Sequence, residues 1–96
     1  MDKLAALKGL SIKIDKIDLK ILDLISDRQS LVKEVVRYKN RDQIVDEKRI
    51  EYILCKLDEE AKKRGIPQEL VRELWKSMIK SFISYEEQIF DKREKK

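Results

Sequence analysis

The chain has 96 residues, of which 44% are charged and 42% hydrophobic, a balance that suits one folded helical domain and not a disordered chain. Its net charge of +4 is spread over interspersed lysines and acids, which argues against nucleic acid as a partner. One cysteine, Cys55, and no histidine exclude an internal disulfide, a Cys/His zinc site and a histidine-activated nucleophile.

Residues 1–96 are expected to form a single domain, and the charged end at residues 92–96 is expected to fray in solvent. No apolar run approaches the roughly 18 residues of a membrane span, so no membrane partner is expected. A lone cysteine suits a reducing compartment, which makes the cytoplasm the expected location. Cys55 itself is expected to pack in the core, because no histidine is present to activate it.

A very long first helix is predicted from about Lys3 to Lys39. At about 1.5 Å per residue it would be about 54 Å long, too long for a compact monomer with a radius of gyration of about 13 Å. A second copy of the chain can cover its apolar side, so the pattern predicts an intertwined helical homodimer. That side, the heptad seam, alternates steps of three and four residues and consists of Leu7, Leu10, Ile14, Ile17, Ile21, Leu24, Leu31, Val35 and Tyr38.

The rest of the chain predicts two further helices and no strand, and therefore an all-α fold of three helices. A polar loop over residues 40–44 precedes a second helix that runs from Val45 or Asp46 to about Arg64. Gly65 is expected to cap that helix, and Pro67 to lie in the first turn of a third helix that runs to about Lys92. The apolar stripe of the second helix is Ile50, Ile53, Leu54, Leu57 and Ala61. The third helix carries Leu70, Val71, Leu74, Trp75, Met78, Ile79, Phe82, Ile83, Ile89 and Phe90.

Two charged residues interrupt these stripes, Arg28 in the first helix and Glu86 in the third. A buried charge is costly unless it has a partner or a ligand. One interpretation pairs the two residues with each other or extends them into solvent. The other is an internal pocket for an anionic ligand, since the planar guanidinium of Arg28 can bind both oxygens of a carboxylate.

The register of these residues resembles the all-helical chorismate mutase family, whose first helix reads approximately L-R-x-x-I-D-x-I-D, I-x-x-L-x-x-R and V-x-x-x-K. The resemblance spans nearly the whole chain, and its register is more specific than that of a generic coiled coil. The segments that carry it are LSIKIDKID at 10–18, ILDLISDR at 21–28, VKEVVRYK at 32–39, Val45-Asp46, Lys48-Arg49, Gly65-Ile66-Pro67 and the third helix.

The resemblance implies an isomerase of the shikimate pathway and aromatic amino acid biosynthesis, which converts chorismate to prephenate in a dimer with two enclosed sites. This pericyclic Claisen rearrangement needs no cofactor and no metal. By motif position, Arg28 and Arg49 would hold the substrate carboxylates, and Lys39 would contact a carboxylate and the ether oxygen. Asp46 would bind the ring hydroxyl or order Lys39. Glu86 falls where the family has Gln or Glu facing the ether oxygen, and a Glu must be protonated to donate there, which burial favours.

Three positions depart from the mutase pattern. Ser11 stands where the family has an Arg that reaches the partner's site, Ile50 where a Glu binds the ring hydroxyl, and Phe82 where Ser or Ala is usual. Ile50 and Phe82 resemble the isochorismate pyruvate-lyases of salicylate and siderophore biosynthesis, which eliminate pyruvate by a related pericyclic step. Those enzymes usually keep the first-helix Arg, so Ser11 fits neither activity. Three functions therefore remain as alternatives: a weak or divergent mutase, a lyase, and a non-catalytic dimerisation or regulatory domain.

Overall fold

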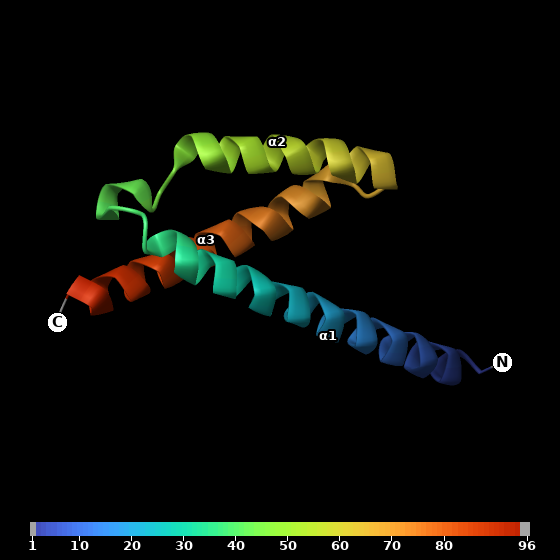
Figure 1. The fold of residues 1–96 in the computed structure, drawn as a ribbon. Helices are drawn as coiled ribbons and strands as arrows, with labels where there is room; N and C mark the ends of the chain where they lie inside the picture. The colour runs from blue at the N-terminus through green and yellow to red at the C-terminus, as the bar shows by residue number, and fades with distance from the viewer. Residues whose placement is uncertain (1, 95–96) are drawn as a thin grey trace. The chain divides into compact units, whose positions relative to one another are not determined.

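The structure, a computed structural model, describes residues 2–94 except for the side chain of Glu94, and its regular elements are all helical (Figure 1). They are α1 (Lys3–Val36), the short 3-10 helix η1 (Arg41–Gln43), α2 (Glu47–Arg64) and α3 (Gln68–Glu94). The expected all-α class, with three helices and a very long first helix, is confirmed.

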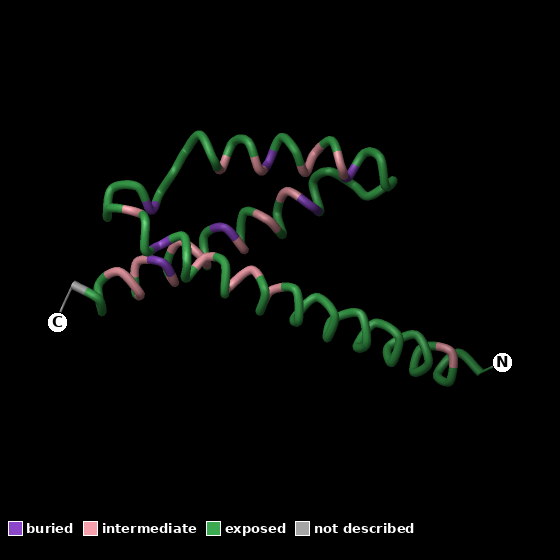
Figure 2. Tube along the Cα trace, in the orientation of Figure 1, coloured by how far each residue is buried: buried purple, intermediate pink, exposed green. Residues whose placement is uncertain are grey.

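The chain divides within α1 into two units, which are described separately. The first unit extends to Leu31, and the second begins at Val32 and holds the remaining elements. Among residues 2–31 none is buried, as the tube in Figure 2 shows. The heptad seam of this unit is open, from 46% exposed at Ile21 to 66% at Leu24. Further exposed apolar side chains lie beside the seam, so the apolar surface is wider than the heptad pattern predicts: Leu4, Ile12, Leu19 and Leu22.

The end of α1 comes three residues before the predicted end at Lys39, because the backbone tightens there. The amides of Tyr38 and Lys39 bond to carbonyls three residues back, at 3.0 and 3.2 Å, which is the pattern of a 3-10 turn. Val36, the last residue of α1, is fully buried. The predicted polar loop contains η1, whose start at Asn40 is closed by a capping box with Gln43.

α2 and α3 form an antiparallel hairpin, and α2 is capped at both of its ends. Asp46 caps α2 by accepting from the amide of Arg49 at 3.0 Å. Gly65 closes the helix at a φ of 68°, a left-handed conformation that glycine adopts without steric cost. Pro67 lies one residue before α3 and not in its first turn as predicted, and its carbonyl accepts from the amide of Val71 at 3.3 Å.

The apolar core of the described residues lies wholly in the second unit, where α2 and α3 pack together with the end of α1 and the loop after it. The buried apolar residues of α2 and α3 all belong to the predicted apolar stripes. Only part of each stripe is buried, however, and Leu70 and Leu74 remain about half exposed. The buried apolar residues are Val36, Ile44, Leu54, Ala61, Val71 and Ile79.

Two remaining expectations concern the ends and the surface. The tail expected to fray at 92–96 begins inside α3, which is helical to Glu94, whereas residues 95–96 lie outside the described residues. Within residues 2–94, no helix offers a stretch both long and apolar enough to cross a membrane.

Candidate active site

The centre of the candidate site is an ion pair between the loop after α1 and the C-terminal half of α3. Lys39 Nζ donates to Glu86 Oε1 at 3.2 Å, and the two side chains are only 23% and 9% exposed. Glu86 is the single buried charged residue in the part of the chain that the structure describes. This partner explains how a charged residue can interrupt the apolar stripe of α3, because the free-energy cost of burying a carboxylate is offset beside a cation.

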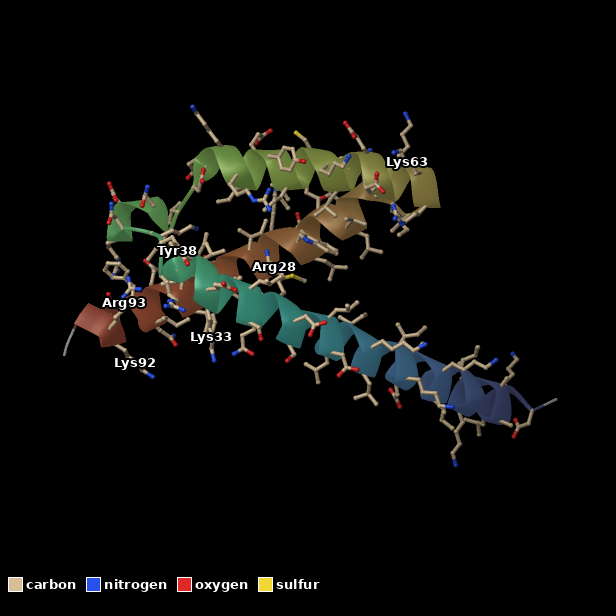
Figure 3. The ribbon with its side chains drawn as sticks, in the orientation of Figure 1. Arg28, Lys33, Tyr38, Lys63, Lys92 and Arg93 are labelled. Carbon is tan, nitrogen blue, oxygen red and sulfur yellow. The ribbon has the colours of Figure 1, made fainter. Side chains whose placement is uncertain are left out.

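Lys39 is placed by the backbone that precedes it. Its amide bonds to the carbonyl of Val36, and that same carbonyl accepts from Arg93 Nη1 at 3.4 Å. Arg93 also lies over the ring of Phe90 at 5.0 Å, so its guanidinium is held from two sides. Figure 3 places Arg93 on the last turns of α3 and Tyr38 at the end of the α1 segment.

An open hollow of about 380 Å³ lies beside Lys39, and the predicted residue Asp46 lines it as well. The remaining lining residues are Tyr38, Asp42, Gln43, Val45, Glu47 and Lys48. One oxygen of Asp46 caps α2, and a carboxylate has a second oxygen that can accept a further hydrogen bond. The structure therefore brings Lys39 and Asp46 to one concave surface, with both charge signs available to a polar ligand.

Arg49 and Ile50 are consecutive residues in the first turn of α2 but face different surroundings. The guanidinium of Arg49 lies over the ring of Tyr52 at 5.5 Å and is exposed. Ile50 is half-buried in a groove of about 410 Å³ between α2 and α3, together with Ile79 and Ile83. Neither residue lines the hollow beside Lys39.

Phe82 precedes Glu86 by one helical turn, so both lie on the same face of α3. Its ring meets that of Tyr85 edge to face, with the centroids 6.2 Å apart. Phe82 is half-buried, which agrees with its place in the predicted stripe.

Ser11 and Arg28 belong to the first unit. Ser11 is exposed, whereas Arg28, which Figure 3 labels on α1, is half-buried in a stretch of the helix that is otherwise mostly exposed. Two features of the second unit escaped sequence analysis, namely Arg41 and Arg93, because an arginine in a polar segment gives no signal of its partner. The Asn40-to-Gln43 spacing could have indicated the capping box.

Cys55 is exposed on α2, so the expectation that it packs in the core was wrong. Its thiol bonds to Glu51 Oε1 at 3.5 Å, and this bond raises the pKa of Cys55 above its ordinary value. A raised thiol pKa reduces the reactive thiolate, so Cys55 remains a poor nucleophile. No group of Cys, Asp and Glu side chains within residues 2–94 is arranged to hold a metal ion.

Comparison with protein families matches residues 10–87 to chorismate mutase type II. The chain belongs to this family. The matched region contains Lys39, Asp46, Arg49 and Glu86, and it ends one residue after Glu86. Chorismate mutases are isomerases, so the family supports an enzyme of that class. Comparison with individually curated proteins gives no match.

Proposed function

We propose that this chain is a chorismate mutase that converts chorismate to prephenate. The observation that carries the proposal is the shielded Lys39–Glu86 pair, because by resemblance to the family these are the two positions expected to face the ether oxygen. In the rearrangement the ether C–O bond breaks as a new C–C bond forms, and no proton is gained or lost. The protein has only to hold the substrate compact and stabilise charge on the departing oxygen.

Each proposed role uses a group that suits it. Arg28 and Arg49 hold the two carboxylates, since a guanidinium fork matches a carboxylate. Lys39 contacts a carboxylate and the ether oxygen, with Glu86 beside it, and Asp46 accepts from the ring hydroxyl or orders Lys39. The observed bond from Lys39 to Glu86 supports a preorganised cation, which keeps its direction without reorganisation when the substrate enters.

The working form is proposed to be a homodimer. The heptad seam of residues 7–31 is about half exposed or more along its length, and a continuous exposed apolar surface of this kind needs a partner. A second copy offers the same seam, and its long helix would close the site from the other side. The exposed thiol of Cys55 suits a reducing cytoplasm as the place of the reaction.

The main alternative is an isochorismate pyruvate-lyase, and it is favoured by Ile50 and Phe82. Ile50 sits among Ile79 and Ile83 where a mutase would present a carboxylate, and Phe82 fills space that a small residue leaves open. Under the remaining alternative the chain is a non-catalytic dimerisation or regulatory domain, and exposed Ser11, without the cation that both activities use, favours it.

One assay separates these functions. Purified protein receives chorismate or isochorismate in separate reactions between about pH 5 and pH 8, and prephenate and salicylate are measured. Prephenate alone supports the mutase, and salicylate supports the lyase. If neither substrate turns over, and a bicyclic diacid that mimics the transition state gives no thermal protection, both enzymatic functions are wrong.

Glu86→Gln tests the role of the acid. A Gln amide donates a hydrogen bond at any pH, whereas a carboxyl group donates only when protonated. We therefore expect wild-type prephenate formation to rise as pH falls, and the Glu86→Gln variant to show a flat profile that exceeds wild type at neutral pH. Glu73→Gln, an exposed acid of the same helix, is the matched control and should follow wild type. Parallel profiles for Glu86→Gln and wild type would remove Glu86 from the reaction.

A further inference from the structure

The loop that carries Lys39 is fastened on both sides to the last turns of α3. Before Lys39, Arg93 holds the carbonyl of Val36. After it, Arg41 bonds through one guanidinium nitrogen to Asp91 and through the other to Glu87, the latter at 3.5 Å. Lys39 therefore lies between two anchors on the helix that also presents Glu86.

The arrangement of acids on α3 explains why two anchors are useful. Glu87 and Asp91 are four residues apart and share one face of the helix, so a single guanidinium fork spans both. Glu86 lies on the neighbouring face with Phe82, four residues earlier. Two adjacent glutamates both attract an ammonium group, and a long flexible lysine can reach either one. Because Arg41 occupies Glu87, Lys39 is left with Glu86.

We propose that Arg41 is a positioning residue, which directs Lys39 to Glu86 by holding Glu87 and Asp91. The inference rests on the proposed function for its catalytic consequence, but the selection of Glu86 by Lys39 is a property of the protein alone. Asp91 and Arg93 lie beyond the region matched by the family, which ends at Glu87, so the family match does not assign this device.

The expected effect is modest, because the clamp that Arg41 forms with Glu87 and Asp91 is about half exposed to solvent. The side chains of Arg41 and Asp91 are 51% and 50% exposed, and that of Glu87 is 38% exposed. Ion pairs this exposed are individually weak, so we expect Arg41→Ala to lower kcat about fivefold with KM changed less than about twofold. Loss of kcat at a nearly constant KM is the signature of a misdirected transition-state contact.

The test measures the position of Lys39 without reference to turnover. Trace acetylation of all lysines, read by mass spectrometry, compares Lys39 with exposed Lys33 of α1 as the internal reference. In Arg41→Ala the relative labelling of Lys39 should rise about threefold, because a weakly held ion pair opens more often. Arg37→Ala is the matched control, since among the described residues its exposed side chain makes no bond. Arg41→Gln repeats the measurement if the alanine variant fails to fold.

A second-site variant separates positioning from direct substrate binding. The double variant Arg41→Ala with Glu87→Gln removes the competing acid together with the guanidinium that holds it, so Lys39 protection and kcat should both recover at least partly. If Arg41 contacts a substrate carboxylate instead, that contact is still missing in the double variant, and no recovery of activity overturns the proposal. Unchanged Lys39 labelling in Arg41→Ala and Arg41→Gln also overturns it. Increased labelling in protein that converts neither substrate upholds the clamp and rejects the proposed function.

Discussion

The first thirty residues of α1 and the α2–α3 hairpin have similar apolar patterns but opposite outcomes. None of residues 2–31 is buried, whereas the second unit buries apolar side chains of α2, of α3, of the end of α1 and of the loop before α2. An isolated amphipathic helix gains little stability from its own backbone, and in proteins most of its stability comes from packing of its apolar face. The difference shows that the apolar face of the hairpin is covered within the chain, whereas the apolar face of the first thirty residues of α1 is left exposed.

The two regions also treat charge differently. In the second unit the buried carboxylate of Glu86 has Lys39 as its partner, and the half-buried acids of α2 form ion pairs as well, Glu60 with Arg64 and Asp58 with Arg72. The first unit contributes Arg28, which is proposed to hold a substrate carboxylate, and Ser11, which stands where the family pattern has an Arg that reaches the partner's site. Under the proposed function, the chemistry therefore depends on completing α1 with a second copy.

Leu24→Asp should have the largest effect of these variants, because it places a charge on the heptad seam of α1. Leu24 lies on the heptad seam and is 66% exposed in the single chain, so it is proposed to be buried only in the dimer. Removing two buried leucines from a symmetric interface costs about 5 kcal/mol, or more than about a thousandfold in Kd. Sedimentation equilibrium should find monomers without mutase activity. Ser26→Asp, which adds the same charge to the outward face of α1, should remain dimeric; equal loss in both variants would argue against the seam.

Leu54→Ala should weaken the second region alone. Leu54 is 6% exposed in the hairpin core, and its truncation leaves a cavity that costs about 3 kcal/mol. Urea unfolding should show this loss at every protein concentration, whereas the loss in Leu24→Asp should shrink on dilution, because the wild-type dimer itself then dissociates. Lys56→Ala, at an exposed position of α2, serves as control. A negligible change in the free energy of unfolding of Leu54→Ala would mean that Leu54 does not belong to the core of the hairpin.

Ser11→Arg should restore the cation that the family pattern places in the partner's site. An added charge-assisted contact to the substrate is worth about 1.4 kcal/mol, so kcat/KM for chorismate should rise about tenfold. Ser26→Arg adds the same side chain away from the seam and should leave kcat/KM unchanged. A higher kcat/KM in both variants would indicate general electrostatic attraction of the substrate. An unchanged kcat/KM in both would mean that residue 11 does not belong to the site.

Glu60→Gln should give the smallest effect. Bonds from Arg64 and Lys63 lower the pKa of Glu60 from its ordinary 4.5 to about 2. A lowered pKa in the folded protein means that the stabilisation is present above the ordinary pKa and is lost as pH falls through about 2. The stability difference between wild type and Glu60→Gln should therefore be small at neutral pH, because the group is solvent-screened, and vanish near pH 2. A difference that grew with acidity would reverse this assignment.

Much of the fold could be predicted because the chain marks its own boundaries. The bounds of α2 were predicted to within two residues from Asp46, Gly65 and the apolar spacing. Glu86 was recognisable as a candidate site residue because it is a charged residue in an apolar stripe. The partner of Glu86 could not be predicted, since Lys39 is 47 residues away and Arg28 was an equally plausible cation. Which side chains meet depends on packing between elements, which spacing within one element does not encode.

The same limit applies to Arg41, Arg93 and Cys55. Exposed arginines look alike in sequence, and only the fold brings Arg41 to Glu87 and Asp91. Cys55 precedes an apolar stripe residue by two positions, but its side chain leaves the helix on the solvent side. The wider apolar surface of α1, including Leu19 and Leu22, was hidden because a heptad count records only the seam.

The most direct measurement follows prephenate formation from chorismate as the protein is diluted through its dimer dissociation, with sedimentation on the same samples. If two copies complete the site, specific activity should fall in proportion to the dimer fraction and recover on concentration. A folded monomer with full specific activity, or a stable dimer that forms no prephenate at any concentration, would contradict the proposal.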